Sequence, residues 1–264
     1  MRIGFIGCGN MAGAMIGGII KNGCVKPEEI IGSNATQKGR ERTKETYGIE
    51  IAKNNVQVAM ESDVVFLSVK PQFYEQVIEE ISSSIKEEQI IVAIAPGKTL
   101  EWLEEKFGKK VKLVRSMPNT PALVGEGMTA VCVNEQVSEK ELEMVCRIME
   151  SFGKVEVIPE RLMDAVVAVS GSSPAYIFMF IEAMADAAVM CGMPRMQAYK
   201  FAAQAVLGSA KMVLETGMHP GELKDMVCSP AGTTIQAVRK LEEKGLRSAV
   251  IEAMKTCADV SKGM

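Results

Sequence analysis

Residues 3–12 read IGFIGCGNMA, a short apolar run that leads directly into a glycine-containing turn. The apolar run is typical of a buried strand, and the residues that follow have the spacing of an amphipathic helix. Between strand and helix, Gly7 permits a tight turn and Gly9 lets the backbone approach a pyrophosphate. The amides that open the helix point at such an anion. This GxGxxA pattern predicts a dinucleotide site made by Ile6, Gly7, Cys8, Gly9, Asn10, Met11 and Ala12.

Strand-like and helix-like segments alternate beyond this motif. Up to about residue 115 the runs EIIGSN, DVVFLSV, QIIVAIA and KLVRSM are each followed by a helical stretch. Such alternation predicts a parallel sheet with crossover helices. Two later runs, GMTAVCVN (127–134) and KVEVIP (154–159), flank a helix that Ser138 and Glu141 start with a capping box, and they extend the same sheet. We therefore predict an α/β fold with an N-terminal Rossmann domain, doubly wound around a mostly parallel sheet.

The sequence changes character after Pro159, because strand-like runs stop and helical spacing continues to the end. We predict an NAD(P)-binding Rossmann domain over residues 1–160 and an all-α dimerisation and substrate-binding domain over residues 161–264. The segment 175–193 is apolar enough for a membrane span, yet it carries Glu182 and Asp186 four residues apart. Two carboxylates on one face are costly in hydrocarbon. We expect a helix buried against other helices or a second subunit, and thus a homodimer and no membrane partner.

Composition narrows the functional classes further. The 264 residues carry a net charge of −3, which argues against a nucleic-acid partner. The chain begins directly in a strand-like run without an export signal, so we expect a cytoplasmic location. Its seven cysteines are odd in number and scattered, without a CxxC pair. This pattern favours reduced thiols and no bound metal.

The end of the second predicted strand bears on cofactor choice. An enzyme specific for NAD usually places Asp or Glu there against the ribose 2′-hydroxyl, but this chain reads Gly32-Ser33-Asn34. Lys38, Arg40 and Arg42 follow. Hydroxyl, amide and cationic groups favour a 2′-phosphate, so NADPH is the preferred cofactor and NADH the alternative. The basic residues can equally form a solvated helix face.

A second candidate segment follows the strand 63–69, where Lys70 and Pro71 place a cation and a helix-starting proline at the carboxyl end of the sheet. Ligands bind at that end in doubly wound folds. The pattern leaves open whether Lys70 faces the cofactor or the solvent.

Five pieces of sequence carry a resemblance along the whole chain: GFIGCGNMA (4–12), SVKPQ (68–72), RSMPNTP (115–121), AVSGSSPAY (168–176) and HPGELKDMVCSPAGTTIQA (219–237). In these pieces the sequence resembles the pyrroline-5-carboxylate reductase family. The resemblance implies NAD(P)H-dependent reduction of 1-pyrroline-5-carboxylate to L-proline, the last step of proline biosynthesis. It also implies helical domains that interlock in a dimer, with each active site between a cofactor domain and the dimeric helices, and possible larger rings of dimers.

The same resemblance implies particular contacts. Ser33, Asn34, Thr36 and Asn55 would lie at the adenosine end of the cofactor. Val69, Lys70, Ala95 and Pro96 would lie along its middle and nicotinamide end, with Pro71 beside them. Glu160, Thr233 and Thr234 would surround the substrate. Ala231 replaces one glycine of the family's usual turn, and Met226 stands where some relatives have a polar residue.

The residues themselves fit reduction of an imine. A protonated iminium is electrophilic without an enzyme acid, and the only histidine, His219, sits in an HPG turn typical of a helix start. The amides of Gly232, Thr233 and Thr234 at a helix N-terminus can bind a carboxylate. The Thr234 hydroxyl then orients the ring nitrogen as the catalytic residue. The same turn also fits an ordinary helix cap with Ser229 or Thr233 as the capping residue.

Two other functions remain alternatives. A β-hydroxyacid dehydrogenase also joins a Rossmann domain to helices, but its group places a catalytic lysine on the long helix after the linker, and residues 175–193 contain none. A non-catalytic dinucleotide-sensing module would bind the cofactor without turnover.

Overall fold

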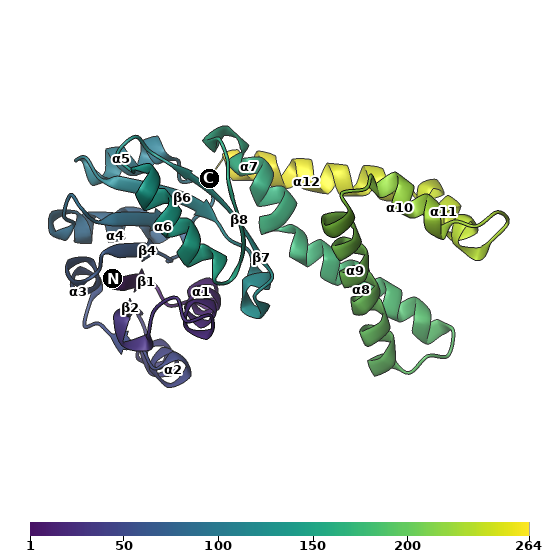
Figure 1. The fold of residues 1–264 in the computed structure, drawn as a ribbon, viewed down its shortest axis with the longest axis horizontal. Coiled ribbons are helices and arrows are strands. Elements are labelled where there is room, and N and C mark those ends of the chain that lie inside the picture. The colour runs from purple at the N-terminus through teal and green to yellow at the C-terminus, as the bar shows by residue number, and fades with distance from the viewer. Residues whose placement is uncertain (264) are drawn as a thin grey trace. The chain divides into compact units, whose positions relative to one another are not determined.

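Eight strands form one mostly parallel sheet in the order β3-β2-β1-β4-β5-β6-β7-β8 (Figure 1). The computed structural model describes residues 1–263. The strands are β1 (Ile3–Ile6), β2 (Ile30–Ser33), β3 (Glu50–Ile51), β4 (Val64–Leu67), β5 (Ile90–Ala93), β6 (Lys112–Met117), β7 (Gly127–Val133) and β8 (Gly153–Val157). β1, β2, β4 and β5 are buried throughout, as expected for apolar strands covered on both faces.

Helices connect these strands and cover both faces of the sheet. They are α1 (Asn10–Lys21), α2 (Gln37–Tyr47), α3 (Asn55–Glu61), α4 (Tyr74–Ile81), α5 (Leu100–Phe107) and α6 (Glu139–Glu150). The short helical turns are η1 (Pro27–Glu29), η2 (Pro71–Phe73), η3 (Ser82–Ser84), η4 (Thr120–Val124) and η5 (Glu160–Leu162). α1 and α6 pack into one apolar cluster, and α3, α4 and α5 pack into the other. The capping box of Ser138 and Glu141 at α6 is confirmed.

The doubly wound topology fixes where a ligand binds. β1 pairs with β2 on one side and with β4 on the other, so the chain reverses its winding direction between β1 and β4. Ligands bind outside the carboxyl ends of the strands at such a switch point. The prediction of a mostly parallel sheet is confirmed, and the two later runs do extend it. β7 runs antiparallel to β6, and β8 is parallel to β7.

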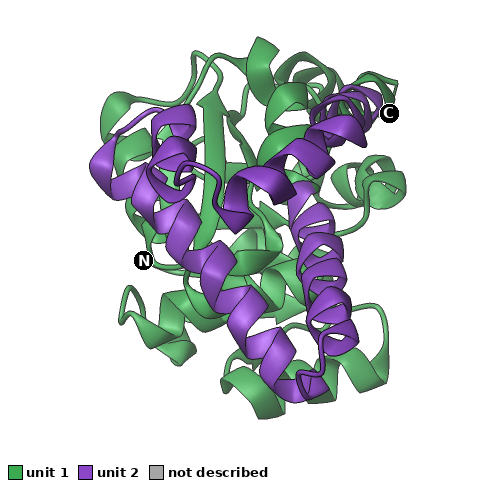
Figure 2. Ribbon diagram, turned by 90° about the vertical axis from the view of Figure 1, so that its right-hand side faces the viewer, with its two compact units in different colours: residues 1–172, 257–264 green, residues 173–256 purple. Residues whose placement is uncertain are grey.

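The described chain divides into two compact units (Figure 2). The first comprises residues 1–172 and the chain from Cys257 on, and the second comprises residues 173–256. In the first unit, β8 and η5 are followed by α7 (Met163–Val166) and by η6 (Val167–Gly171), a π-helical turn. The second unit contains α8 (Ser173–Met190), α9 (Arg195–Thr216), α10 (Pro220–Val227), α11 (Thr233–Glu243) and most of α12 (Leu246–Lys262). This division lies later than residue 160, where the sequence changes character.

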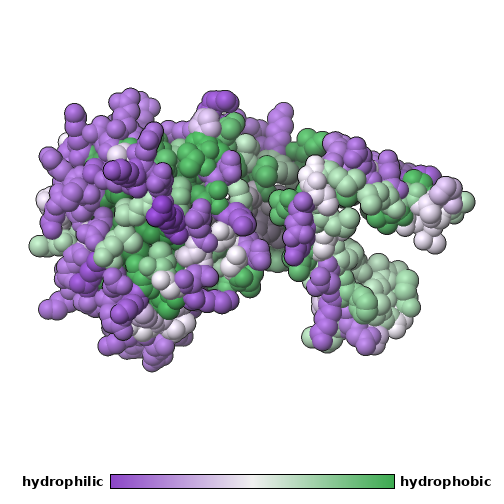
Figure 3. All heavy atoms as spheres, in the orientation of Figure 1, coloured by the Kyte–Doolittle hydropathy of each residue, from purple (hydrophilic) through white to green (hydrophobic). Residues whose placement is uncertain are grey.

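The second unit is all-helical, as predicted, but its long helices are not buried within the chain. In α8 the side chains of Phe178, Met179 and Met190 are 63%, 69% and 88% exposed, and Ala185 is the buried residue. Apolar residues are therefore prominent on its surface (Figure 3). Within the single chain α9 covers one side of α8 and leaves the rest open. Burial by helices of the same chain is therefore incomplete, and burial against a second subunit stays a prediction.

The helical segment Glu160–Met190 is also long and apolar enough to cross a membrane, with only 11% of its most apolar window buried. One such segment is weak evidence for a span. Exposed apolar surface of this size is typical of a protein–protein or membrane interaction site.

Candidate active site

The glycine turn after β1 has the geometry of a phosphate-binding loop. Gly7 has φ +94, and a Cβ there would meet the backbone nitrogen of Val69 at 2.9 Å, so only glycine fits. The amides of Gly7 and Cys8 both donate to the carbonyl of Ser33, at 3.1 and 3.0 Å. The Gly9 amide donates back to Gly7 at 3.0 Å. These bonds tie the turn to the end of β2 and leave the first amides of α1 for a ligand.

The open space at this helix start fits a dinucleotide. A Cβ built on Gly9, the N-cap of α1, meets no atom within 4 Å, so the backbone there faces free space. The amides of Asn10, Met11 and Ala12 lack intrahelical partners, as the first amides of every helix do. They carry the positive end of the helix dipole, which attracts a pyrophosphate. Ile6 is buried beneath the turn, so it supports this site without facing it.

The cysteine in this turn is inert. Burial raises the pKa of the Cys8 thiol to about 12, so the thiol stays protonated. All seven cysteines are free, as expected from their scattered positions.

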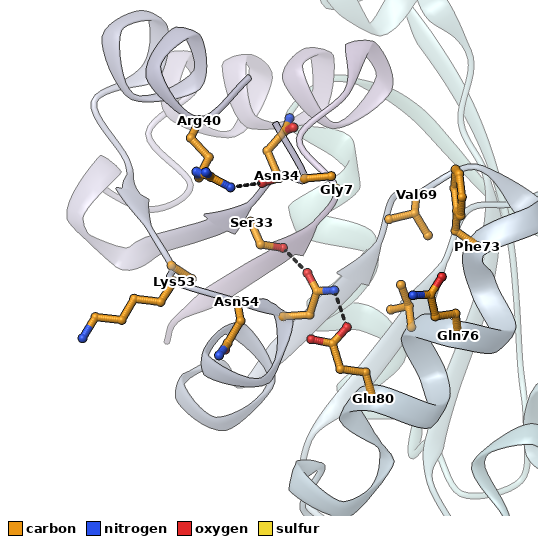
Figure 4. Close-up of a pocket in the computed structure, with 14 residues that line it drawn as sticks. Gly7, Ser33, Asn34, Arg40, Lys53, Asn54, Val69, Phe73, Gln76 and Glu80 are labelled. Atoms are coloured by element: carbon orange, nitrogen blue, oxygen red, sulfur yellow. Dashed lines mark hydrogen bonds between the residues drawn. The ribbon is translucent and has the colours of Figure 1, made fainter. Parts of the chain in front are cut away.

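A cavity of about 380 Å³ lies next to the turn (Figure 4). Several predicted cofactor residues line it, namely Gly7, Ser33, Asn34, Asn55 and Val69. Its other walls include Arg40, Lys53, Asn54, Phe73, Gln76 and Glu80. The structure thus brings together the loops after β1, β2 and β4 and one face of α4.

A chain of hydrogen bonds crosses the floor of this cavity. The Ser33 hydroxyl donates to Oδ1 of Asn55 at 2.6 Å, and Nδ2 of Asn55 donates to the Glu80 carboxylate at 2.7 Å. The side chain of Asn34 donates to the carbonyl of Cys8 at 3.1 Å, which joins β2 to the glycine turn. Thr36 caps α2 by accepting from the amide of Gly39, so its hydroxyl serves the helix first.

The cavity also has a cationic side. Arg40 donates from Nη1 to the carbonyl of Asn34 at 2.9 Å, which holds its guanidinium across the end of β2. Lys53 lines the same cavity from the segment that follows β3. The sequence did not predict Lys53 as a cofactor residue, and it indicated Arg40 only as part of the basic run after β2.

The loops after β4 and β5 carry the remaining predicted cofactor residues. Lys70 is exposed and precedes Pro71, which opens η2 as predicted. Ala95 is 3% exposed and Pro96 is half-buried in the loop between β5 and α5. Their roles stay predictions, because these residues lie outside the walls of the cavity.

Glu160 already has two partners. Its Oε1 accepts from Nη1 of Arg115 and from the amide of Leu100, both at 2.8 Å. Arg115 is 3% exposed, so this ion pair is largely buried on the arginine side. Removing one partner of such a pair leaves an uncompensated charge. Both bonds end on Oε1, and the contact of Glu160 with a substrate stays a prediction.

The predicted substrate turn lies in the second unit, at the start of α11. Ala231 has φ 58, a left-handed conformation that costs a residue with a Cβ on the order of 1 kcal/mol. Gly232 is the N-cap without a side-chain cap, so neither Ser229 nor Thr233 is the capping residue. The Gly232 amide donates to the carbonyl of Ser229 at 3.0 Å, so it does not provide the free donor predicted for a substrate carboxylate. The amides of Thr233 and Thr234 remain at the helix N-terminus.

His219 has the structural role that its sequence context indicates. It is the N-cap of α10, and its Nδ1 accepts from the amide of Gly221 at 3.0 Å. One ring nitrogen is thus used as an acceptor for this amide, and the imidazole caps the helix.

The sequence missed Phe73, Gln76 and Glu80 as cavity residues. Their spacing of three and four places them on one face of a helix that follows a strand ending at the switch point. That signal was available in the sequence.

A Rossmann sheet with a glycine turn and an adjoining cavity, joined to a helical unit, is the architecture of dinucleotide-dependent oxidoreductases. Residues 160–264 match the family model for pyrroline-5-carboxylate reductase dimerisation, and residues 2–97 match that for NADP oxidoreductase, coenzyme F420-dependent. The chain is 54% identical to the pyrroline-5-carboxylate reductase of Escherichia coli over 99% of this chain and 97% of that protein. It is 43% identical to the Methanosarcina acetivorans enzyme, over 99% and 97% of the two chains.

Solved structures agree with these sequence relatives. The pyrroline carboxylate reductase of Plasmodium falciparum, solved with NADP bound, superposes with a TM-score of 0.92 at 30% identity, over 100% of this chain and 97% of that one. This chain belongs to the pyrroline-5-carboxylate reductase family, the NAD(P)-dependent oxidoreductases of proline biosynthesis.

Proposed function

We propose that this chain reduces 1-pyrroline-5-carboxylate to L-proline with NADPH as its preferred cofactor and Thr234 as the residue that orients the imine. The observation that carries the proposal is the turn 229–234, which presents two free amides and a threonine hydroxyl at the start of α11. When bound, the reduced nicotinamide supplies the hydride that the imine carbon accepts.

The turn provides the contacts that an imino acid needs. The amides of Thr233 and Thr234 bind the substrate carboxylate, favoured by the positive end of the α11 dipole. The Thr234 hydroxyl accepts a hydrogen bond from the protonated ring nitrogen and so stabilises the iminium, the electrophilic form. Glu160 contributes through Oε2, the oxygen that Arg115 and Leu100 leave open.

No side chain has to supply a proton in this scheme. The iminium brings its proton from solvent, and reduction converts it to an amine that holds the proton already on nitrogen. His219 remains a helix cap. Catalysis rests on orientation and on stabilising charge.

The preference for NADPH rests on the cationic side of the cavity. Arg40 and Lys53 line it near Ser33 and Asn34, where an NAD-specific enzyme has a carboxylate. Glu80 is the carboxylate of the cavity, and its bond to Asn55 turns it toward α3. The predicted contacts of Gly9, Asn10, Met11 and Ala12 belong to the pyrophosphate.

We also propose that residues 161–264 assemble the chain into a homodimer. The match to the dimerisation model covers the helices whose apolar side chains are exposed in the single chain. Burial of that surface drives association. The functional division at residue 160, a larger ring of dimers and the cytoplasmic location remain predictions of the sequence.

The test is the initial rate of NADPH and of NADH oxidation with 1-pyrroline-5-carboxylate, with L-proline identified as the product. We expect one proline for each NADPH oxidised and a higher kcat/KM with NADPH. Oxidation of a β-hydroxyacid by NADP⁺, without reduction of the imine, would establish the dehydrogenase alternative. Cofactor binding without any turnover would establish the sensing module.

A further inference from the structure

Tyr74 is a fully buried tyrosine beside the loops that lead to the predicted nicotinamide site. It is the first residue of α4, directly after the segment that carries Lys70 and Pro71. Its ring belongs to the apolar cluster under the sheet, with an exposed fraction of 0%. Its hydroxyl donates to the carbonyl of Leu67 at 2.5 Å. The same oxygen accepts from the amides of Ile94 and Ala95, at 3.0 and 3.1 Å.

These three bonds replace a strand ladder that has ended. The pairing of β4 with β5 runs as far as Leu67 and Ala93. Beyond that point the amide of Ser68 turns to the carbonyl of Ile6 on β1, while the chain after β5 leaves the sheet. Buried backbone groups need partners. The phenol oxygen provides them for one carbonyl and two amides at the point where the strands part.

A single hydroxyl therefore connects the end of β4 with the segment that follows β5. Leu67 leads within two residues to Val69, a wall of the cofactor cavity. Ile94 and Ala95 lead directly to Pro96 and the start of the loop before α5. Both roles of the hydroxyl, as donor and as acceptor, require a neutral phenol. Burial raises the pKa of Tyr74, although the two amides act in the opposite direction, so the phenol stays neutral.

We propose that Tyr74 is a positioning residue, whose hydroxyl holds residues 94–96 and 67–69 in the places that the nicotinamide half of the cofactor requires. This inference rests on the proposed use of a nicotinamide cofactor at the carboxyl ends of these strands. Tyr74 itself touches backbone and not ligand, so it acts through the two loops. The Ser33–Asn55 pair, which serves the adenosine half, lies outside these two segments.

The test is Tyr74→Phe, which keeps the ring and removes the hydroxyl. We expect the Kd for NADPH to rise about tenfold, since each factor of ten corresponds to roughly the free energy of one or two lost hydrogen bonds. The Kd for 2′,5′-ADP, which carries only the adenosine half, should stay within about twofold. Tyr47→Phe is the matched control, because Tyr47 is a half-buried tyrosine of α2 that packs against Gly13. The Tyr47→Phe variant should bind NADPH with the same affinity as the unchanged protein.

Hydrogen exchange gives a readout that does not depend on cofactor binding. In the unchanged protein the amides of Ile94 and Ala95 should exchange as slowly as those of β5, and in Tyr74→Phe they alone should become fast. Fast exchange in the unchanged protein would overturn the inference. So would an unchanged NADPH affinity in Tyr74→Phe, or an equal loss for NADPH and 2′,5′-ADP. Failure of the unchanged protein to reduce the imine would instead overturn the proposed function.

Discussion

The hydroxyl of Ser33 donates to Oδ1 of Asn55 at 2.6 Å and thereby fixes the orientation of the Asn55 amide. The amide nitrogen then donates to Glu80 at 2.7 Å. Because the hydrogen of Ser33 is used in this pair, its oxygen presents lone pairs to the cavity. The second hydrogen of the Asn55 amide is left for a ligand. At the adenosine end of the cavity, the Ser33 oxygen is therefore held as an acceptor and the Asn55 amide nitrogen as a donor.

Glu80→Ala should weaken cofactor binding without affecting chemistry, because Asn55 loses the partner that holds its amide. We expect KM for NADPH to rise about fivefold, the effect of a hydrogen bond worth about 1 kcal/mol, with kcat unchanged. Glu79→Ala is the control for net charge, because it removes the same charge from the preceding residue of α4, which is also exposed. Equal effects of the two variants would show that Asn55 is positioned without Glu80.

Arg40→Gln should lower affinity for NADPH far more than for NADH. A charge-assisted bond to the 2′-phosphate contributes about 1.5–3 kcal/mol, so the loss for NADPH should be tenfold or more, against twofold or less for NADH. Fluorescence titration with both cofactors measures this ratio. Arg42→Gln, an exposed arginine on the same helix, is the control. A similar loss for both cofactors would remove the basis for NADPH preference.

Glu141 should make stability depend on pH in the acid range. Burial raises the pKa of Glu141, but the hydrogen bonds from Lys112 and Ser138 and the charge of Lys112 together lower it by more. The result is a pKa of about 2. Since the pKa in the folded state lies below the ordinary 4.5, the stabilisation is complete above about pH 4.5 and is lost as the pH falls toward about 2. Urea unfolding at about pH 6 and about pH 3 should show a smaller cost of Glu141→Gln at the lower pH. Glu143→Gln, exposed on the same helix, should show no such difference.

Phe178→Glu should convert the proposed dimer into a monomer. Phe178 is 63% exposed on α8, and a charge there would have to be desolvated in an interface. Light scattering after size-exclusion chromatography measures the mass. Met60→Glu, at a residue 56% exposed on α3 of the first unit, should leave it unchanged. A Phe178→Glu protein that stays dimeric would place the interface elsewhere.

The sequence predicted the sheet because its strands are short, buried and apolar, as in residues 64–67 and 90–93. It missed β3, which has only two residues, Glu50 and Ile51, and no apolar run. It also left open the direction of β7, since strand direction depends on how the chain returns to the sheet and not on the residues of the strand.

The site was predicted unevenly for a similar reason. The glycine turn has a local signature, but Asn55 came from resemblance alone, because its contact with Ser33 joins residues far apart in sequence. The partners of Glu160 and the three bonds of Tyr74 are also long-range. The apolar face of α8 was read correctly as apolar, yet composition does not distinguish burial within a chain from burial against a second copy.

The most direct test of the proposed reaction is the initial rate of NADPH oxidation with 1-pyrroline-5-carboxylate for the unchanged protein, Thr234→Ala and Thr234→Ser. We expect kcat to fall roughly tenfold to a hundredfold in Thr234→Ala, since a bond to a charged group is lost, while the Kd for NADPH stays the same. Thr234→Ser keeps the hydroxyl and should retain most of the activity. Full turnover by Thr234→Ala would contradict the role of the Thr234 hydroxyl in orienting the imine.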